Sequence, residues 1–221
     1  VPAKDMPATD RKVGIDLGVE TLATFSDGTK IGNPRHLKKY ERKLAREQRR
    51  ISRRKGARRG EKQSMRYLKQ RKRVARVHAK ITDARTDALH KVTTMLADEN
   101  QVLCMENLNA KGMVRNHHLA KAVSDASFGE FARLLEYKCA ERGRTLVKVG
   151  RFYPSSKPCS ACGHRLDVLP LSVRSWDCPV CGAHHDRDVN AARNILTEGK
   201  RILSNTEGTA GHAGTVAATV A

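Results

Sequence analysis

Two pairs of cysteines constrain this 221-residue chain more than any other feature of its sequence. Each pair has the spacing Cys-x-x-Cys and is followed by a glycine, and fifteen residues separate the two pairs. Two thiolates spaced in this way chelate one ion from a tight turn, and four thiolates complete a closed tetrahedral zinc site. We therefore predict one structural Zn²⁺, bound by Cys159, Cys162, Cys178 and Cys181.

Other roles for these cysteines fit the sequence less well. A redox-active pair lacks the strand and helix context of a thioredoxin motif. The remaining cysteines, Cys104 and Cys139, stand singly in apolar stretches, which indicates a reducing compartment and not a disulfide framework. Because four cysteines satisfy the ion, the neighbouring histidines are expected on the surface or facing nucleic acid; these are His164, His184 and His185.

The positive charge of the chain is concentrated in one segment. Residues 34–85 hold 22 Lys and Arg against four acids, which accounts for +18 of the net charge of +20. Such a field fits a nucleic-acid backbone, whose phosphates release counterions to a basic partner. The alternative is a solvated, self-repelling helical face. We predict nucleic-acid contacts from this segment, at Arg49, Arg50, Arg53, Arg54, Lys55, Arg58, Arg59, Arg71, Lys72 and Arg73.

Residue periodicity predicts the order of the elements. Alternation in "KVGIDLGVETLATFSDGTKIG" predicts three strands with a hairpin turn at Asp27-Gly28. From residue 34, helical spacing predicts two helices that form a long antiparallel hairpin. A strand in "QVLCMEN", an irregular loop over 107–127, a helix ending before Gly143 and a strand in "TLVKVG" follow. After the cysteines comes a helix capped by Gly199, so the chain reads as an α/β domain with two insertions.

Acidic residues stand at three separate points of the predicted domain. Asp16 lies within the first strand between two apolar residues, and Glu106 ends the later strand. In "HDRDVNAARN", Asp186 or Asp188 opens the last helix; Asp186 suits the N-cap, which leaves Asp188 inside the first turn. Each acid has an ordinary structural explanation when taken alone. Together, carboxylates converging on one pocket would bind two Mg²⁺ or Mn²⁺ ions, as a phosphodiester-cleaving nuclease requires.

The motifs "GIDLG", "MENLN", "YPSSKPCSACG", "CPVCG" and "HDRDVNAARNI" occur in an order that resembles the C-terminal half of the TnpB family. That family comprises transposon-encoded proteins related to type V CRISPR nucleases. The resemblance implies a ribonuclease-H-like (RuvC) fold, with Asp16, Glu106 and Asp188 as catalytic acids that bind Mg²⁺ or Mn²⁺. It also implies RNA-guided cleavage of a single-stranded or unwound DNA target, with a guide RNA from the transposon end.

The resemblance also divides the chain. We expect RuvC-like parts at 1–32, 99–155 and 186–200, a basic helical hairpin at 33–98, a zinc ribbon at 156–185 and a disordered tail at 201–221. Family members carry a large N-terminal half that holds guide RNA, whereas about twelve residues precede the first strand here. We therefore expect RNA guidance for the full-length protein. We expect that protein in the cytoplasm of a bacterium or archaeon, near the nucleoid and with no membrane contact.

Several alternatives and lesser positions complete the prediction. The chain can instead be a non-catalytic DNA- or RNA-binding module or repressor, or a transposase that joins strands directly. An ATPase of the actin type would need a second glycine-rich phosphate loop, which is missing after Glu106. Arg187 is a candidate phosphate contact, and Ser155, Ser156 and Lys157 are weaker ones. We expect Trp176 and Phe152 to pack in the core; the alternative is that they stack on a base.

Overall fold

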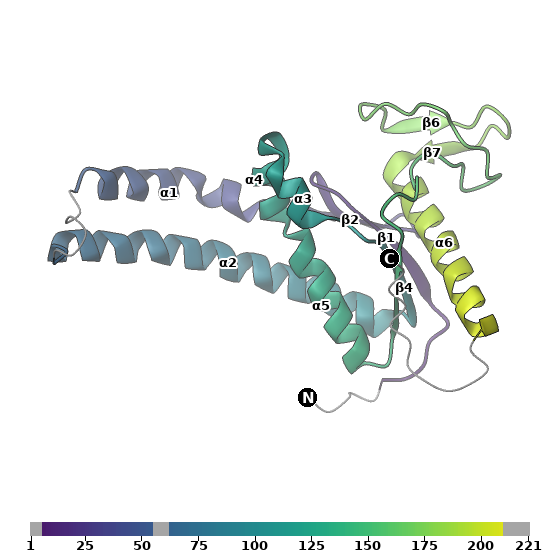
Figure 1. Cartoon of the computed structure of the whole chain (residues 1–221), viewed down its shortest axis with the longest axis horizontal. Helices are drawn as coiled ribbons and strands as arrows, with labels where there is room; N and C mark the ends of the chain where they lie inside the picture. The colour runs from purple at the N-terminus through teal and green to yellow at the C-terminus, as the bar shows by residue number, and fades with distance from the viewer. Residues whose placement is uncertain (1–5, 55–61, 210–221) are drawn as a thin grey trace. The chain divides into compact units, whose positions relative to one another are not determined.

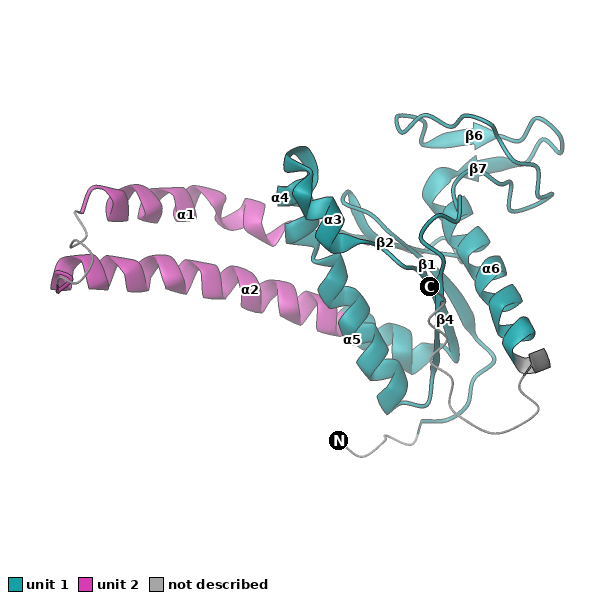
Figure 2. Ribbon diagram, viewed as in Figure 1, with its two compact units in different colours: residues 1–33, 92–221 teal, residues 34–91 magenta. Residues whose placement is uncertain are grey.

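The computed structural model describes residues 6–54 and 62–209, and these form two compact units (Figures 1 and 2). Unit 1 contains residues 1–33 and 92–221, and unit 2 contains residues 34–91. The basic segment of the sequence therefore interrupts unit 1 between its third and fourth strands. The predicted interruption was 33–98; in the structure, the end of its second helix belongs to unit 1.

A five-stranded sheet with the order β3-β2-β1-β4-β5 forms the centre of unit 1. The strands are β1 (Lys12–Leu17), β2 (Thr21–Phe25), β3 (Lys30–Gly32), β4 (Val102–Glu106) and β5 (Thr145–Val149). The first three strands are antiparallel and are joined by tight turns; Gly28 in the β2–β3 turn has a φ of 96°. Strands β4 and β5 run parallel to β1, so the carboxyl ends of these three strands share one edge of the sheet.

The two faces of this sheet pack against different helices. Helix α6 (Arg187–Thr209) covers the face that carries Val102, Cys104, Val147 and Val149, and Ile195 of α6 completes that cluster. Alternation along the strands sends Ile15, Leu103 and Met105 to the opposite face, where they are buried. Helix α5 (Phe128–Glu141) has its own buried stripe, which includes Phe131, Leu134 and Leu135. Figure 1 shows α5 and α6 on opposite sides of the sheet.

Unit 2 is a pair of helices. Helix α1 (His36–Ser52) and the unit 2 part of helix α2 (Met65–Glu99) bury Leu44, Val77 and Ile81 between them, with Leu37, Tyr40 and Val74 packed alongside. A second contact is polar: Gln70 Nε2 donates to Glu47 Oε2 at 2.7 Å and to the Glu47 carbonyl at 3.1 Å. In the described residues of this unit, the two helices expected from the sequence are present and pack against each other.

Two expectations about secondary structure were wrong. Residues 107–127 contain two short helices, α3 (Ala110–Arg115) and α4 (His117–Ala126), because Asn109 and Asn116 cap them by accepting the N–H groups of Gly112 and His118. Helix α6 continues ten residues past Gly199, so residues 201–209 are helical where a disordered tail was predicted; residues 210–221 lie outside the described part of the chain.

The glycine at position 199 has a packing role in place of a capping role. A Cβ atom there would lie 2.3 Å from the sulfur of Cys104, so only glycine lets α6 pass this close to β4.

The described helices include none that is both long and apolar enough to cross a bilayer.

Candidate active site

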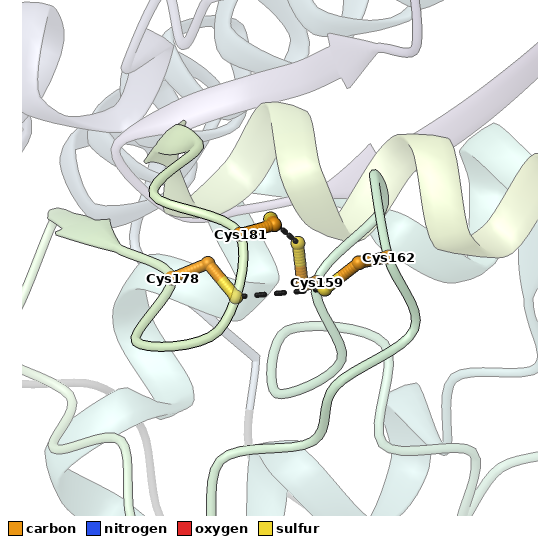
Figure 3. Close-up of side chains that lie close together, drawn as sticks. All are labelled: Cys159, Cys162, Cys178 and Cys181. Carbon is orange, nitrogen blue, oxygen red and sulfur yellow. Dashed lines mark hydrogen bonds between the residues drawn. The ribbon is translucent and has the colours of Figure 1, made fainter.

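The four cysteines predicted to bind zinc lie together in the segment 156–185, which we call the cysteine module (Figure 3). Their sulfur atoms all lie within 4.8 Å of one another, with Cys159 to Cys181 at 3.7 Å and Cys162 to Cys178 at 3.6 Å. Zinc–sulfur bonds of about 2.3 Å in a tetrahedron require sulfurs about 3.8 Å apart. The predicted grouping is confirmed, and its geometry fits a zinc ion.

The two cysteine pairs adopt the same backbone turn. In each, the glycine after the second cysteine has positive φ, 80° at Gly163 and 70° at Gly182, and its N–H donates to the carbonyl of the first cysteine. The N–H of the first cysteine is bonded as well, from Cys159 to His164 O and from Cys178 to Ala183 O. This repeated turn leaves both sulfur atoms of a pair on one side, where they could bind one ion together.

The residues around the cysteines correct one prediction. His185 is buried, not exposed: its Nε2 lies 3.0 Å from the sulfur of Cys159 and its ring is 4.6 Å from that of Trp176. Strand β7 (His184–Asp186) pairs with β6 (Ser175–Asp177), so alternate side chains face opposite ways and His185 faces the cysteines. Trp176 lies in the module core as expected, whereas Phe152 is 92% exposed and its predicted core packing was wrong.

The last strand of the cysteine module leads directly into α6. Asp186 ends β7, and its Oδ1 accepts the N–H groups of Asp188 and Val189 at 3.1 and 3.0 Å. Asp186 is therefore the N-cap of α6, and Lys30 holds its other oxygen at 2.7 Å. Burial acts to raise the pKa of Asp186, but Lys30 and the two N–H donors outweigh it and lower that pKa. Asp188 lies in the first turn, as predicted.

Strand register places Asp16 and Glu106 side by side. Ile15 of β1 pairs with Met105 of the parallel strand β4, so the next residue of each strand is an acid at the shared carboxyl edge. Residues two apart on a strand share a face. Asp16 therefore faces the same way as Gly14, and Glu106 the same way as Cys104, which is the face that α6 covers.

Helix α6 brings the third acid to this edge. Gly14 lies directly beneath Ala192 O and Leu196, and Cys104 lies beneath Gly199. Asp188 is one turn before Ala192 on the same stripe of the helix, and its charge acts on Asp16. Three segments far apart in sequence thus bring Asp16, Glu106 and Asp188 to one end of the sheet.

Electrostatics link these acids. The pKa of Asp16 is raised well above its usual value, first by burial and then by the charges of Glu106 and Asp188, while Arg187 opposes the shift. Burial also raises the pKa of Glu106, and a hydrogen bond from the Ser155 hydroxyl acts against that rise. Buried carboxylates that destabilise each other's ionised forms are stabilised by a cation between them.

The acids are spread more widely than the cysteines. Among the described residues, only the cysteine set has three or more candidate ligand atoms all within 4.8 Å of one another. Carboxylates that serve two ions about 3.5–4 Å apart span a longer distance than ligands of one ion.

Three polar residues near the acids were missed or misassigned from the sequence. Ser155 was predicted to contact phosphate, but it is buried and its hydroxyl donates to Glu106 Oε1. Asn190 and Asn194 of α6 are 1% and 5% exposed and hydrogen-bond the segment that carries Ser155. Asparagine is unfavourable inside a helix, so two of them four residues apart were a usable signal.

The predicted nucleic-acid contacts fall mainly in unit 2. Lys55, Arg58 and Arg59 lie outside the described residues. On α2, three consecutive cations are exposed, namely Arg71, Lys72 and Arg73. A groove of about 300 Å³ between the two helices is lined by Lys43, Glu47, Arg50, Arg73, Arg76, Val77 and Lys80. This lining carries a strong excess of positive charge.

Two other predicted phosphate contacts have partners within the protein. Arg187 Nη1 donates to the carbonyls of Pro170 and Val173 at 2.7 and 3.4 Å. Lys157 Nζ donates to the carbonyl of Asp167 at 2.6 Å. Both side chains therefore hold the loop of the cysteine module, and their contact with phosphate stays a prediction.

Comparison with known proteins yields a consistent group of relatives. Residues 2–117 match the OrfB_IS605 family, described as "Probable transposase", and residues 128–195 match the "Cas12f1-like, TNB domain". A Streptomyces pristinaespiralis protein named "Putative RNA-guided DNA endonuclease" is 50% identical over 87% of this chain and 46% of its own length. InsQ of Escherichia coli K12, with the same descriptive name, is 34% identical over 87% of this chain and 50% of its own length.

A solved structure extends the likeness to the fold. The protein in a cryo-EM structure of a Cas12f1–sgRNA–target DNA complex matches with a TM-score of 0.58 at 19% identity, over 87% of this chain and 51% of that one. The chain spans about half the length of the Streptomyces and Escherichia coli relatives. The transposase family matches more than half of the residues, and the relatives agree with that match. The chain therefore belongs to the TnpB family of IS605-type transposon proteins.

Proposed function

We propose that this chain carries the catalytic part of an RNA-guided DNA endonuclease of ribonuclease-H-like (RuvC) type. The observation that supports the proposal is the register that puts Asp16 beside Glu106 at the carboxyl edge of β1 and β4, together with the effect of the Asp188 charge on Asp16. The names of the relatives support this chemistry, since several contain the words RNA-guided DNA endonuclease.

The acids fit two Mg²⁺ or Mn²⁺ ions. Carboxylate oxygens are the ligands such ions prefer, and burial makes the ionised form of Asp16 costly without a positive partner. Two bound ions would supply a water activated for attack and stabilise the leaving oxygen of a phosphodiester. Asp16 and Glu106 would hold this site from the sheet, and Asp188 would close it from the helix.

The remaining parts have supporting roles in this proposal. The cysteine module, with its zinc ion, would keep the start of α6 ordered and so determine where Asp188 lies. The cations of unit 2 would bind the phosphates of the guide RNA or of the DNA strand. The relatives named putative RNA-guided DNA endonucleases are about twice as long as this chain, so guide recognition is proposed for the full-length setting.

The test uses the zinc-loaded 221-residue chain, single-stranded DNA and Mg²⁺, with and without RNA from the transposon end. Asp16→Ala should reduce cleavage by at least about 100-fold, because removing one direct ligand should cost more than removing a supporting residue. The exposed Asp83 provides the matched control, since Asp83→Ala removes the same group from unit 2.

Each possible outcome distinguishes between the functions. Equal cleavage by Asp16→Ala and the unchanged chain would contradict the proposed site. Strand joining in place of cleavage would favour a directly acting transposase. Tight, salt-sensitive binding without cleavage would favour a non-catalytic nucleic-acid-binding module.

A further inference from the structure

Two buried asparagines fasten α6 to the segment that precedes the first cysteine pair. Asn190 Nδ2 donates to the carbonyl of Pro158 at 2.8 Å and more weakly to that of Ser156 at 3.4 Å, while its Oδ1 accepts the N–H of Ser160 at 2.9 Å. Asn194 Nδ2 donates to the carbonyls of Ser155 and Pro158 at 2.8 and 2.7 Å. These contacts join residues 155–160 to the first two turns of α6.

The same segment reaches the sheet through one side chain. The Ser155 hydroxyl donates to Glu106 Oε1, and the Ser155 N–H is held by the carbonyl of Tyr153 at 2.9 Å. Ser155 is therefore fixed through its carbonyl by Asn194, through its N–H by a tight turn, and through its hydroxyl by an acid of the site. Because the Ser155 hydroxyl is fixed in this way, its hydrogen bond restricts the orientation of the Glu106 carboxylate.

We propose that Asn190, Asn194 and Ser155 are positioning residues that set Glu106 on β4 relative to Asp188 on α6. This inference rests on the proposed function, since it assigns the acids to metal binding. The connection runs from α6 through Asn194 to Ser155 and then to Glu106, and it consists of protein groups alone. The two acids are thereby held in register before any cation binds.

The chemistry of the asparagines explains why these residues suit the task. A side-chain amide offers a donor and an acceptor at fixed geometry, and buried groups of this kind are costly when left unpaired. Asn190 and Asn194 are four residues apart and so project from the same side of the helix, where both reach the carbonyl of Pro158. Leucine at either position would keep the volume and lose every donor.

The consequence is a change in affinity for the cations. Residues that orient metal ligands typically contribute about 10- to 100-fold in metal affinity. Without the Ser155 hydroxyl, the Glu106 carboxylate would lose the hydrogen bond that sets its orientation relative to Asp188. We therefore expect Ser155→Ala and Asn194→Leu each to weaken Mn²⁺ binding about 10- to 100-fold. The double variant should show less than the product of the two effects, because both act through one connection.

The experiment measures Mn²⁺ binding by electron paramagnetic resonance on the zinc-loaded chain, without nucleic acid. Zinc content and the unfolding midpoint are recorded for each variant to identify a loss of fold. Ser155→Thr, which keeps the hydroxyl, should retain most of the affinity. Ser204→Ala removes an exposed hydroxyl from the far end of α6, where it donates to Arg201 O, and should leave binding unchanged.

The outcomes separate this inference from the proposed function. If Asp16→Ala and Glu106→Ala bind Mn²⁺ as well as the unchanged chain, the metal site itself is refuted, and this inference with it. If those variants lose binding while Ser155→Ala and Asn194→Leu keep it, only the positioning role is refuted. Should Asn194→Leu lose zinc or unfold, the contrast between Ser155→Ala and Ser155→Thr decides the question.

Discussion

At Gly14 the backbone of β1 lies against the backbone of α6. A Cβ atom there would stand 2.0 Å from Ala192 O and 2.9 Å from the Cβ of Leu196, so any side chain forces the helix away from the sheet. The motif "GIDLG" thus combines an acid of the candidate site with the residue that lets α6 approach it. Within this motif, Gly14 determines how closely α6 packs on β1, and Asp16 supplies the acid.

Gly14→Ala is expected to lower the free energy of unfolding by at least about 1–3 kcal/mol, the usual cost of overfilling a packed interface. Gly32→Ala is the matched control, because nothing lies within 4 Å of a Cβ at that position on the edge strand. Urea unfolding of both variants measures the difference. Equal stability of the two would show that α6 does not pack on β1 as described.

Residue patterns in the sequence predicted the acids and the cysteines but not their support. Asp16 and Glu106 could be found because each is a carboxylate at an apolar strand, and the cysteines because of their spacing. The contact of Ser155 with Glu106 joins residues 49 apart, and that of Asn194 with Ser155 joins residues 39 apart. Such contacts depend on how the sheet and α6 pack, so no local pattern predicts them.

At the scale of elements, the cysteine module and α6 form a continuous structure. Strand β7 ends at the N-cap of α6, Asn190 binds both neighbours of Cys159, and His185 contacts the sulfur of Cys159 itself. Because a structural zinc site contributes its binding energy to folding, the ion should stabilise the first turns of α6 as well as the module.

Cys178→Ser is expected to abolish stoichiometric zinc binding and to weaken both Mn²⁺ binding and DNA cleavage, because Asp188 would no longer have a fixed position. Metal analysis, resonance titration and a cleavage assay measure these three effects. Cys139→Ser makes the same change at a buried cysteine of α5, outside the module, and should keep zinc. Unchanged Mn²⁺ affinity in Cys178→Ser would show that the module and the acids are independent.

Sequence reasoning was accurate for elements with strong periodicity. It failed where single side chains determine the first or last residue of a helix. The strands of the five-stranded sheet and the long helices were identified, since their apolar periods are clear. Helices α3 and α4 were taken for a loop, because their starts depend on single asparagine caps. The end of α6 was placed too early, because Gly199 is the usual sign of a helix end and here allows the close approach to Cys104.

For the molecule as a whole, charge is divided between the two units. Most of the excess positive charge lies in residues 34–85, while the proposed active site is built from unit 1. Binding and catalysis should therefore respond to different changes: cations of unit 2 should affect affinity and its salt dependence, and acids of unit 1 should affect cleavage.

Replacing three exposed cations of α2 by glutamine, Arg71, Lys72 and Arg73, should weaken single-stranded nucleic-acid binding. It should also reduce the slope of log affinity against log salt by about 0.7 for each phosphate that the variant no longer neutralises. The matched control removes three cations of unit 1 that already pair with acids, Arg133, Lys148 and Arg201. Fluorescence anisotropy at several salt concentrations measures both; an equal weakening in the two variants would contradict a binding role specific to unit 2.

The connection order of the sheet has a consequence for biosynthesis. A ribosome makes the chain from its N-terminus, so β1 with Asp16 emerges before the whole of unit 2, and α6 with Asp188 emerges after the cysteine module. Until α6 has left the ribosome, Cys104, Val147 and Val149 have no cover and Gly14 has no helix above it. A nascent chain would thus hold its basic helices well before it could assemble the proposed active site, and the proposed cleavage could not begin until α6 had been made.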